Sequence, residues 1–368
     1  MQIVCLFIFM RQYIKFLKCL KPGVLLLLSA MLCLASCAGR NGYVRIQGYA
    51  QGGTYTVTVN LDGVDVSPEE LKDSLDAILG RIDFTLSGYN RNSLLSRLNE
   101  GKEVELNEMF ADIYGRSREV FDQTGGAVDV GSAPLYDMWG FGFRSGEMPS
   151  ASQVDSVKAF SGMEHLRVSV SDLVGKKVTS EDLFQGVTGQ SGPRLNFNAI
   201  AQGYSCDLIA SYLYSLGVRD MMVNIGEIFC DGVNPSGKPW TVGVDRPEDG
   251  NDVPGAQLQG VFAVPEGPHG VVTSGNYRKF YIRDGRKYAH TIDPRSGYPV
   301  DHNLLSATII ADDATLADAY ATYCMVVGLE EAKAFVESRS DLEGFLVYDE
   351  AGEFKTWCSE GLESHRVQ

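Results

Sequence analysis

Five side chains that can do chemistry lie within the stretch 290–322. His290, Asp293 and Arg295 belong to the run His-Thr-Ile-Asp-Pro-Arg-Ser-Gly, which places an imidazole, a carboxylate and a guanidinium among turn-forming residues. Asp318 and Thr322 follow in a segment with helical apolar spacing, so their side chains should lie one turn apart on one face. Hard oxygen ligands of this kind suit Mg²⁺ and a phosphate ester. The stretch therefore predicts phosphoryl chemistry.

The alternative interpretation of these residues is structural. Asp318 could be a solvated carboxylate, and Thr322 could bond the carbonyl four residues earlier. However, Asp318 lies among alanines, where a buried and unpaired carboxylate would be costly and a bound metal would compensate its charge. Of the five histidines, His290 is the one followed by an aspartate and a Pro-Arg-Ser-Gly turn, which favours a functional role for it.

Two glycine-bearing segments and one helix start are weaker candidates for ligand binding. Taken alone, the run 125–129 (Gly-Gly-Ala-Val-Asp) is more typical of a helix C-cap that leads into a strand. Thr273 and Ser274 precede a glycine and an arginine, and this turn could hold phosphate or simply end a strand. Asn198 is predicted to cap a long helix whose N-terminus could bind an anion, with Asp207 either a further ligand or solvated.

The first 36 residues predict an export signal. They carry four basic residues and no acidic residue before an apolar run, Val24–Ala35, which is shorter than the roughly 20 residues of a spanning helix. The run ends at Leu34-Ala35-Ser36-Cys37, which resembles the lipobox of bacterial lipoproteins; an ordinary signal with an incidental cysteine is the alternative. We expect Cys37 to carry the lipid, residues 37–43 to form a tether, and residues 44–368 to form a single domain anchored to a membrane and facing the periplasm.

Charge and cysteine content exclude some classes of function. The chain has 32 basic and 47 acidic residues; without the four basic residues of the signal, 28 remain against 47, a formal net charge of −19. Such a surface repels nucleic acid, and no zinc-finger or RNA-recognition motif is present. No Cys-x-x-Cys pair indicates zinc or redox chemistry, and we expect no essential disulfide.

The elements that must position these residues do not alternate in a strict β-α-β order. A strand is predicted over 54–59, and Ser67 and Pro68 then begin a helix. Further helices are predicted from Asn107, over 152–160, 199–216 and 313–327, and from Glu330, and strands over 221–225, 240–244, 261–264, 279–282, 306–310 and 345–348. This pattern favours an α+β fold of mixed, mostly antiparallel sheets with packed helices over a doubly wound sheet.

Taken together, these motifs resemble the ApbE family of flavin transferases. The resemblance extends from about residue 48 to residue 348, and its blocks follow the family's order: Gln51–Tyr55, Ser87–Ser93, Ser96–Asn99, Gly125–Asp129, Pro134-Leu135, Trp139–Gly142, Ala199–Tyr204, Thr273–Gly275, His290–Gly297, and Ala317-Asp318 with Ala321-Thr322. It implies an ApbE-like, T-fold-related architecture and an FAD:protein FMN transferase. Such enzymes use Mg²⁺ to move FMN from FAD onto a Thr or Ser of a target protein through a phosphoester, with release of AMP.

The resemblance also implies roles for individual residues. The metal ligands would be Asp318, Thr322 and the backbone carbonyl of Ala199. His290 would be the base, and Asp293 and Arg295 could orient it or bind phosphate. Flavin-contacting positions would be Gln51, Ser87, Gly88, Tyr89, Ala127, Val128, Asp129, Asn196 and Gln202, with Tyr89 able to stack on the isoalloxazine. The implied partners are FAD and flavoprotein subunits of the Rnf or Nqr type.

Three departures from the family pattern affect the flavin site. Gln202 stands where many members have Lys, Gln51 replaces the usual Met, and the run 224–227 (Asn-Ile-Gly-Glu) has one Gly where a pair is usual. Two other functions remain open: a metal-dependent FAD pyrophosphatase with water as nucleophile, and a non-catalytic FAD-binding lipoprotein. The transferase and the pyrophosphatase share one site and differ only in what occupies the attack position.

Overall fold

The computed structural model describes residues 42–367, apart from 142–147, 167–168, 185–193, 249, 252, 277–279 and 284–285. The predicted signal peptide, Cys37 and most of the predicted tether lie outside the described residues. Residues 44–368 group into one compact unit. Within the part of the chain that is described, no helix combines the length and the apolar character needed to cross a bilayer.

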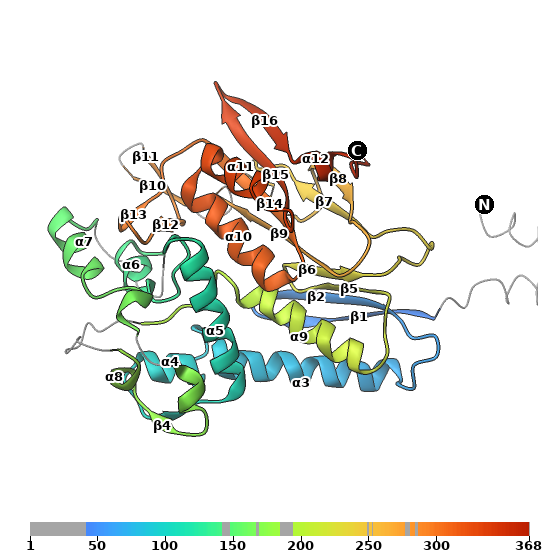
Figure 1. Ribbon diagram of the computed structural model, residues 1–368, viewed down its shortest axis with the longest axis horizontal. Coiled ribbons are helices and arrows are strands. Elements are labelled where there is room, and N and C mark those ends of the chain that lie inside the picture. Colours follow the sequence, from blue (N-terminus) through green and yellow to red (C-terminus); the bar gives the residue numbers. More distant parts are fainter. Residues whose placement is uncertain are drawn as a thin grey trace, which may run out of the picture. The chain divides into compact units, whose positions relative to one another are not determined.

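An eight-stranded sheet forms the centre of the fold (Figure 1). The pairings from its second strand to its last are antiparallel, so the predicted mixed, mostly antiparallel α+β fold is confirmed. The strand order is β1 (Tyr43–Ala50), β2 (Gly53–Asn60), β5 (Met221–Asn224), β6 (Ile228–Asp231), β9 (His269–Gly275), β14 (Leu304–Ala311), β15 (Glu343–Glu350) and β16 (Glu353–Cys358).

Four two-stranded sheets and a set of helices complete the described structure. The small sheets pair β3 (Val104–Glu105) with β4 (Lys177–Val178), β7 (Thr241–Asp245) with β8 (Leu258–Ala263), β10 (Phe280–Arg283) with β11 (Arg286–Ala289), and β12 (Ile292–Asp293) with β13 (Tyr298–Pro299). The α-helices are α3 (Pro68–Leu86), α4 (Leu94–Asn99), α5 (Glu108–Gln123), α6 (Ala133–Met138), α7 (Ala151–Lys158), α8 (Ser180–Leu183), α9 (Ala201–Ser215), α10 (Ala314–Val327), α11 (Leu329–Glu337) and α12 (Glu360–Glu363). Short 3₁₀ turns cover Met163–His165 and Val170–Leu173.

Local capping explains where several helices begin. Ser67 and Glu70 form the predicted capping box of α3, which satisfies backbone N–H groups that the first helical turn leaves open. Helix α5 begins next to Asn107, as predicted, and Asn107 caps it, because its Oδ1 accepts a hydrogen bond of 2.9 Å from the N–H of Phe110. Asp313 caps α10 in the same way.

The predicted cap of the long mid-chain helix is wrong. Helix α9 begins at Ala201 with Ile200 at the N-cap and no side-chain cap, whereas Asn198 was expected there. Asn198 instead lies in a tight turn, because its N–H donates to Asn196 Oδ1 at 2.9 Å and the N–H of Ile200 donates to the Phe197 carbonyl at 3.0 Å. This local hydrogen bonding competes with helical hydrogen bonding, so α9 begins at Ala201 and not directly after Asn198.

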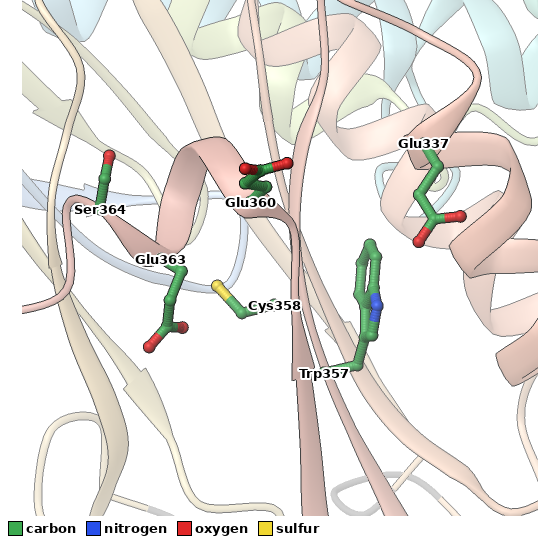
Figure 2. A pocket seen from close by; sticks show the side chains of 6 residues that line it. All are labelled: Glu337, Trp357, Cys358, Glu360, Glu363 and Ser364. Atoms are coloured by element: carbon green, nitrogen blue, oxygen red, sulfur yellow. The ribbon is translucent and has the colours of Figure 1, made fainter.

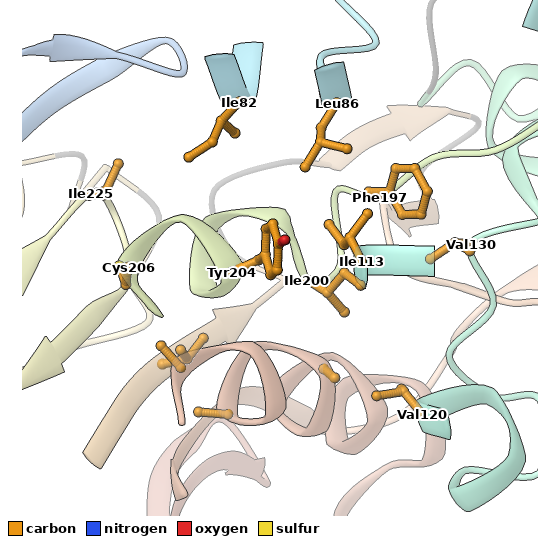
Figure 3. Close-up of a cluster of buried hydrophobic side chains, with 14 of the residues drawn as sticks. Ile82, Leu86, Ile113, Val120, Val130, Phe197, Ile200, Tyr204, Cys206 and Ile225 are labelled. Atoms are coloured by element: carbon orange, nitrogen blue, oxygen red, sulfur yellow. The ribbon is translucent and has the colours of Figure 1, made fainter. Parts of the chain in front are cut away.

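Helices α9 and α10 lie inside the main hydrophobic core. Helix α9 packs on β5 and β6, α10 packs on β9 and β14, and the two helices pack on each other, so they cover one face of the sheet together. Figure 3 shows Ile82 and Leu86 of α3, Ile113 of α5 and Tyr204 of α9 gathered in this core. Buried side chains surround α10 on nearly all sides, which is typical of a helix without a solvent face.

The cysteines of the described chain are free thiols. Cys206, Cys230 and Cys324 are buried, and Cys358 is half-buried on β16. Burial raises the pKa of the Cys230 and Cys324 thiols to about 12, so both stay protonated and behave as small apolar residues at neutral pH.

Candidate active site

Helices α9 and α10 approach each other closely at Gly203. The N–H of Gly203 donates a hydrogen bond of 3.0 Å to Asp318 Oδ2. A Cβ atom at Gly203 would lie 2.0 Å from the carbonyl oxygen of Ala314 and 2.9 Å from the Asp318 Cβ, so the contact requires glycine. Ala199 lies four residues before Gly203, in the turn that leads into α9.

Asp318 is a buried carboxylate, with 5% of the residue exposed. Burial raises the pKa of Asp318 well above its usual range, and the negative charge of Glu227 raises it further. The backbone N–H of Gly203 opposes this effect but does not cancel it. A carboxylate in such surroundings is stabilised by a cation, which restores the electrostatic balance that burial removed.

The donors around Asp318 fit a hard divalent cation. Thr322 is partly buried one turn further along α10, on the same face as Asp318. A carboxylate, a hydroxyl and the Ala199 carbonyl are all oxygen donors, the type that Mg²⁺ prefers. Among the described residues, no group of three or more His, Cys, Asp or Glu side chains could hold a metal, so the predicted set relies on a single carboxylate.

Thr273 and Ser274 lie in strand β9, and the predicted turn at these residues is wrong. Ser274 pairs with Ala307 and Thr273 with Thr308, because antiparallel pairing with β14 continues through Gly275 and overrides the turn preference of these small residues. Their side chains point to opposite faces of the sheet. Thr273 Oγ1 lies 2.8 Å from Thr308 Oγ1, in a hydroxyl pair within the sheet.

Ser274 faces the helical layer that carries Asp318. A Cβ atom at Gly270 would lie 2.3 Å from Ala314 Cα, and Ser274 is four residues further on the same face of β9. Helix α10 runs in the same direction as β9, since both are antiparallel to β14.

Two of the predicted flavin positions surround the start of α9. Gln51 Nε2 donates to Ser205 Oγ at 2.5 Å, and that hydroxyl donates to the carbonyl of Ala201 at 2.6 Å. Gln202 Nε2 donates to the carbonyl of Ile225 at 3.1 Å, in the turn between β5 and β6. The β1–β2 turn and the β5–β6 turn are therefore both tied to the first turn of α9, next to Ala199.

The segment with Ala127, Val128 and Asp129 lies beside Asn196. The N–H of Asn196 donates to the carbonyl of Val130 at 2.7 Å. Ala127 and Val128 have buried side chains, so a ligand could meet them only through their backbone. Asp129 Oδ1 accepts hydrogen bonds from the N–H of Gly131 at 2.7 Å and the N–H of Met163 at 3.0 Å. Burial raises the pKa of the Asp129 carboxyl to about 6. Asp129 thus organises this loop from within.

The loop with Ser87, Gly88 and Tyr89 follows the end of α3. Ser87 Oγ accepts the N–H of Tyr89 at 3.3 Å and that of Asn90 at 3.1 Å, which closes a compact turn. The Tyr89 ring is 71% exposed, so one face of it can stack on a planar ligand. Paired hydrogen bonds between the Asn99 side chain and the Leu195 backbone, at 2.8 and 2.9 Å, tie the following helix α4 to the segment that leads into α9.

The predicted catalytic turn is held by Asp293 and Arg295. Arg295 donates from Nε to Oδ1 at 2.9 Å and from Nη2 to Oδ2 at 3.2 Å, a bidentate pair that raises the pKa of the guanidinium. The N–H of Gly297 donates to the Asp293 carbonyl at 2.7 Å and closes the turn. Because the guanidinium already binds Asp293, the pair is better suited to orienting the turn than to binding phosphate.

A small second core positions the turn next to α10. Ile292 is fully buried with Leu135, Trp139 and Val154, and Trp139 Nε1 donates to the Gly297 carbonyl at 2.8 Å. The ring of His290 lies 6.5 Å from that of Phe141. Strand β12 packs on α10, and His290 lies two residues before β12.

The sequence did not predict the roles of Gly203 and Asp207. Asp207 binds the start of α10, because Oδ1 accepts the N–H of Ala314 and Oδ2 the N–H of Thr315, both at 2.9 Å. Gly203 and Asp207 are four residues apart, so they lie on one face of α9. That spacing was visible in the sequence, but only the position of α10 shows that both residues form hydrogen bonds with it.

Two cavities among the described residues lie away from these donors. One, of about 640 Å³, lies beside β16; Figure 2 shows Cys358 and Glu363 on one side of the strand and Trp357 on the other. The second, of about 450 Å³, is lined by Arg116, Asp207 and Asp313 among others. Neither contains a predicted metal ligand or His290, so we locate the candidate site by its donors and not by cavity volume.

Comparison with known proteins points to one family. The sequence pattern of the ApbE family matches residues 51–346. The FAD:protein FMN transferase of Escherichia coli (strain K12) is 33% identical over 317 residues, covering 84% of this chain and 85% of the relative. That of Vibrio cholerae serotype O1 is 29% identical over 343 residues, covering 91% and 96%.

Solved structures agree in fold. The apo form of the flavinyl transferase ApbE of Pseudomonas stutzeri matches with a TM-score of 0.72 and 31% identity, covering 86% of this chain and 95% of that one. The flavin transferase ApbE of Vibrio cholerae matches with a TM-score of 0.72 and 26% identity, covering 88% and 99%.

Proposed function

The chain belongs to the ApbE family, and on that premise we propose that it is a Mg²⁺-dependent FAD:protein FMN transferase. It attaches FMN through a phosphoester bond to the hydroxyl of a Thr or Ser in a target flavoprotein and releases AMP. The buried carboxylate of Asp318, at the contact between α9 and α10, is the observation that carries the metal-dependent part of the proposal.

The chain's own donors would hold the metal. Asp318 supplies the charged ligand, Thr322 the hydroxyl and Ala199 a backbone carbonyl. The raised pKa of Asp318 supports this assignment, because a carboxylate that is costly when ionised and alone gains most from a cation. When bound, Mg²⁺ would neutralise charge on the pyrophosphate of FAD.

The transfer itself is a displacement at phosphorus. The acceptor oxygen forms a bond to the phosphorus of the FMN moiety, and the bond from that phosphorus to the oxygen bridging to AMP breaks, so AMP leaves with that oxygen. His290 would accept the proton of the acceptor hydroxyl as a general base. The Asp293–Arg295 pair fixes the turn that follows His290, which limits the positions that the imidazole can adopt.

The flavin would lie across the loops that meet at the start of α9. Tyr89 offers an exposed ring for stacking, and Gln51, Ser87, Gly88 and Asn196 come from the loops beside it. Ala127, Val128 and Asp129 would contribute through a fixed backbone, and Ser274 would face the phosphates. Gln202, which binds Ile225, would contribute no positive charge where many family members have Lys.

Product analysis tests the proposal and separates it from the two alternatives. The chain is incubated with FAD, Mg²⁺ and a flavoprotein subunit of the Rnf or Nqr type, and the acceptor mass and the nucleotides are measured. The transferase adds FMN to the acceptor and releases AMP. Free FMN and AMP without modified acceptor would indicate a pyrophosphatase, and intact FAD after long incubation would indicate a flavin-binding lipoprotein.

We further propose that the chain is an exported lipoprotein anchored through Cys37. The support is the order of basic segment, short apolar run and Leu-Ala-Ser-Cys in the sequence. A Cys37→Ser variant should move from the membrane fraction to the soluble periplasmic fraction or retain its signal. Wild-type chain found in the soluble fraction, without a lipid mass on Cys37, would contradict this assignment.

A further inference from the structure

We propose that Asp207 is a positioning residue for the metal site, which fixes α10 against α9 at the register that brings Asp318 to Ala199. The inference rests on the proposed function, because it assumes that Asp318, Thr322 and Ala199 hold the metal. Asp207 itself touches neither the metal nor FAD in this account.

The Asp207 carboxylate makes three hydrogen bonds to the first turn of α10. Oδ1 accepts the N–H of Ala314 at 2.9 Å, and Oδ2 accepts the N–H of Thr315 at 2.9 Å and its hydroxyl at 2.5 Å. The first N–H groups of a helix have no partner within the helix, so a carboxylate from outside satisfies them and interacts favourably with the helix dipole. Asp207 therefore links α9 to the N-terminal turn of α10.

The two helices exchange hydrogen bonds at two levels. The N–H of Gly203 on α9 donates to Asp318 on α10, and the N–H groups of Ala314 and Thr315 on α10 donate to Asp207 on α9. Gly203 and Asp207 are one turn apart on α9, as Ala314 and Asp318 are on α10. Sliding or rotating α10 would break both sets together, so the pair of contacts defines one register.

This register determines the geometry of the donors from different elements. Asp318 and Thr322 belong to α10, whereas Ala199 precedes α9, so their mutual distances depend on how the helices are placed. The chain connection between the helices does not fix that placement, because 98 residues separate the end of α9 at Ser215 from the start of α10 at Ala314. Without Asp207, the Gly203–Asp318 hydrogen bond and the packing of both helices on the sheet would remain to hold the site.

Asp313 provides a matched control on the same helix. Asp313 Oδ1 accepts the N–H of Leu316 at 2.7 Å, so it caps α10 as Asp207 does, but from within α10. Its carboxylate also forms an ion pair of 3.4 Å with Arg116 of α5, and its negative charge contributes to the raised pKa of Asp207. Replacing Asp313 removes a carboxylate cap of α10 at a typical cost of about 1 kcal/mol, and it leaves the bonds between α9 and α10 in place.

Direct metal binding tests the inference without relying on catalysis. Mn²⁺ is titrated into the full chain without FAD and followed by electron paramagnetic resonance, at pH 8 because burial raises the pKa of Asp207 to about 6. The variants are Asp207→Ala, Asp207→Asn, Asp313→Ala and Asp318→Ala. Thermal unfolding of each metal-free variant is measured in parallel.

We expect Asp318→Ala to abolish Mn²⁺ binding and Asp207→Ala to weaken it at least about 10-fold, the lower range for groups that orient metal ligands. Asp207→Asn, which keeps one acceptor oxygen, should fall between wild type and Asp207→Ala. Asp313→Ala should lower the melting temperature about as much as Asp207→Ala does, but it should change the Mn²⁺ dissociation constant less than twofold.

Two results would overturn the inference, and they differ. If Asp318→Ala abolishes binding while Asp207→Ala or Asp207→Asn binds like Asp313→Ala, Asp207 is only a cap and the proposed function stands. If Asp318→Ala binds Mn²⁺ like wild type, the metal site of the proposed function is wrong, and the role of Asp207 falls with it. Should Asp207→Ala not fold, Asp207→Asn decides by the same comparison.

Discussion

The N–H of Gly203 lies 3.0 Å from Asp318 Oδ2 and donates a hydrogen bond to it across the contact between α9 and α10. Gly203 also has a steric role, because the absence of a Cβ lets the backbones of α9 and α10 approach each other. One residue therefore both orients the charged ligand of the candidate metal site and permits its position. The expected metal chemistry depends on this contact.

Gly203→Ala should be destabilising, although alanine is normally the better helix former. The added Cβ would lie 2.0 Å from the Ala314 carbonyl oxygen, so α9 and α10 must separate. We expect a loss of about 1–3 kcal/mol of unfolding free energy, the usual range for overpacking, and loss of Mn²⁺ binding. Denaturant unfolding and a metal titration measure the two effects.

Gly115→Ala is the matched control for this prediction. Gly115 lies in α5 on the exposed side, and a Cβ there would meet nothing within 4 Å. Alanine at this position should stabilise the protein by about 0.5–1 kcal/mol and leave metal binding unchanged. If Gly203→Ala behaved like Gly115→Ala, the close approach at Gly203 would not be essential.

Asp318→Asn should make the metal-free protein more stable than the wild type, and it should remove the stabilisation that Mg²⁺ gives to the wild type. Since burial raises the pKa of Asp318, ionising it in the metal-free protein opposes folding, and this cost grows as the pH rises. The amide removes the charge and should stabilise the metal-free protein by about 1–2 kcal/mol at pH 8. Mg²⁺ should raise the melting temperature of the wild type but not of the variant; a variant that Mg²⁺ still stabilises would argue against Asp318 as ligand.

Asp129→Asn should reveal a carboxyl whose pKa is raised by burial to about 6. Because the folded protein holds this proton more tightly than the unfolded chain does, Asp129 contributes stability below about pH 4 that is lost as the pH rises through 6. The difference in unfolding free energy between wild type and variant should therefore decrease from pH 4 to pH 6.5, by about 3 kcal/mol at most. A difference that is constant over this range would exclude the raised pKa.

His290→Ala tests the proposed base. Loss of a general base costs about 10²- to 10⁴-fold in rate, so kcat for FMN transfer should fall at least 100-fold while KM for FAD changes little. His365→Ala is the control, because the described hydrogen bonds of His365 at the C-terminal end involve its backbone. A loss smaller than 10-fold in His290→Ala would assign proton transfer to another group.

Local patterns in the sequence predicted the helices of eight or more residues and several strands, whereas the short helices α4, α6, α8 and α12 were not predicted. The capping box at Ser67 and Glu70 and the cap at Asn107 depend on residues close in the chain, so a single sequence contains the information. The i, i+4 spacing of Asp318 and Thr322 also follows from one helix. For the same reason the α+β class could be read from the order of these elements.

Contacts between distant segments were the part that the sequence did not reveal. Thr273 and Ser274 look like turn residues, and only pairing with β14 makes them strand. Asn198 looked like a cap until the Asn196 side chain bound its N–H. The role of Asp207 required α10, whose first residues lie 107 and 108 positions later in the chain. The corrections at Thr273, Ser274 and Asp207 come from tertiary pairing, whereas the correction at Asn198 comes from a local hydrogen bond to a residue two positions earlier.

The central claim is metal-dependent transfer of FMN at the Asp318 site, and one reaction tests it most directly. Wild-type chain and the Asp318→Asn variant are each incubated with FAD, Mg²⁺ and the acceptor subunit, and the intact mass of the acceptor and the AMP released are measured together. The wild type should add one FMN to the acceptor for each AMP released, and the variant or EDTA should abolish both. Equal labelling by wild type and Asp318→Asn, or AMP release without acceptor labelling, would contradict the account.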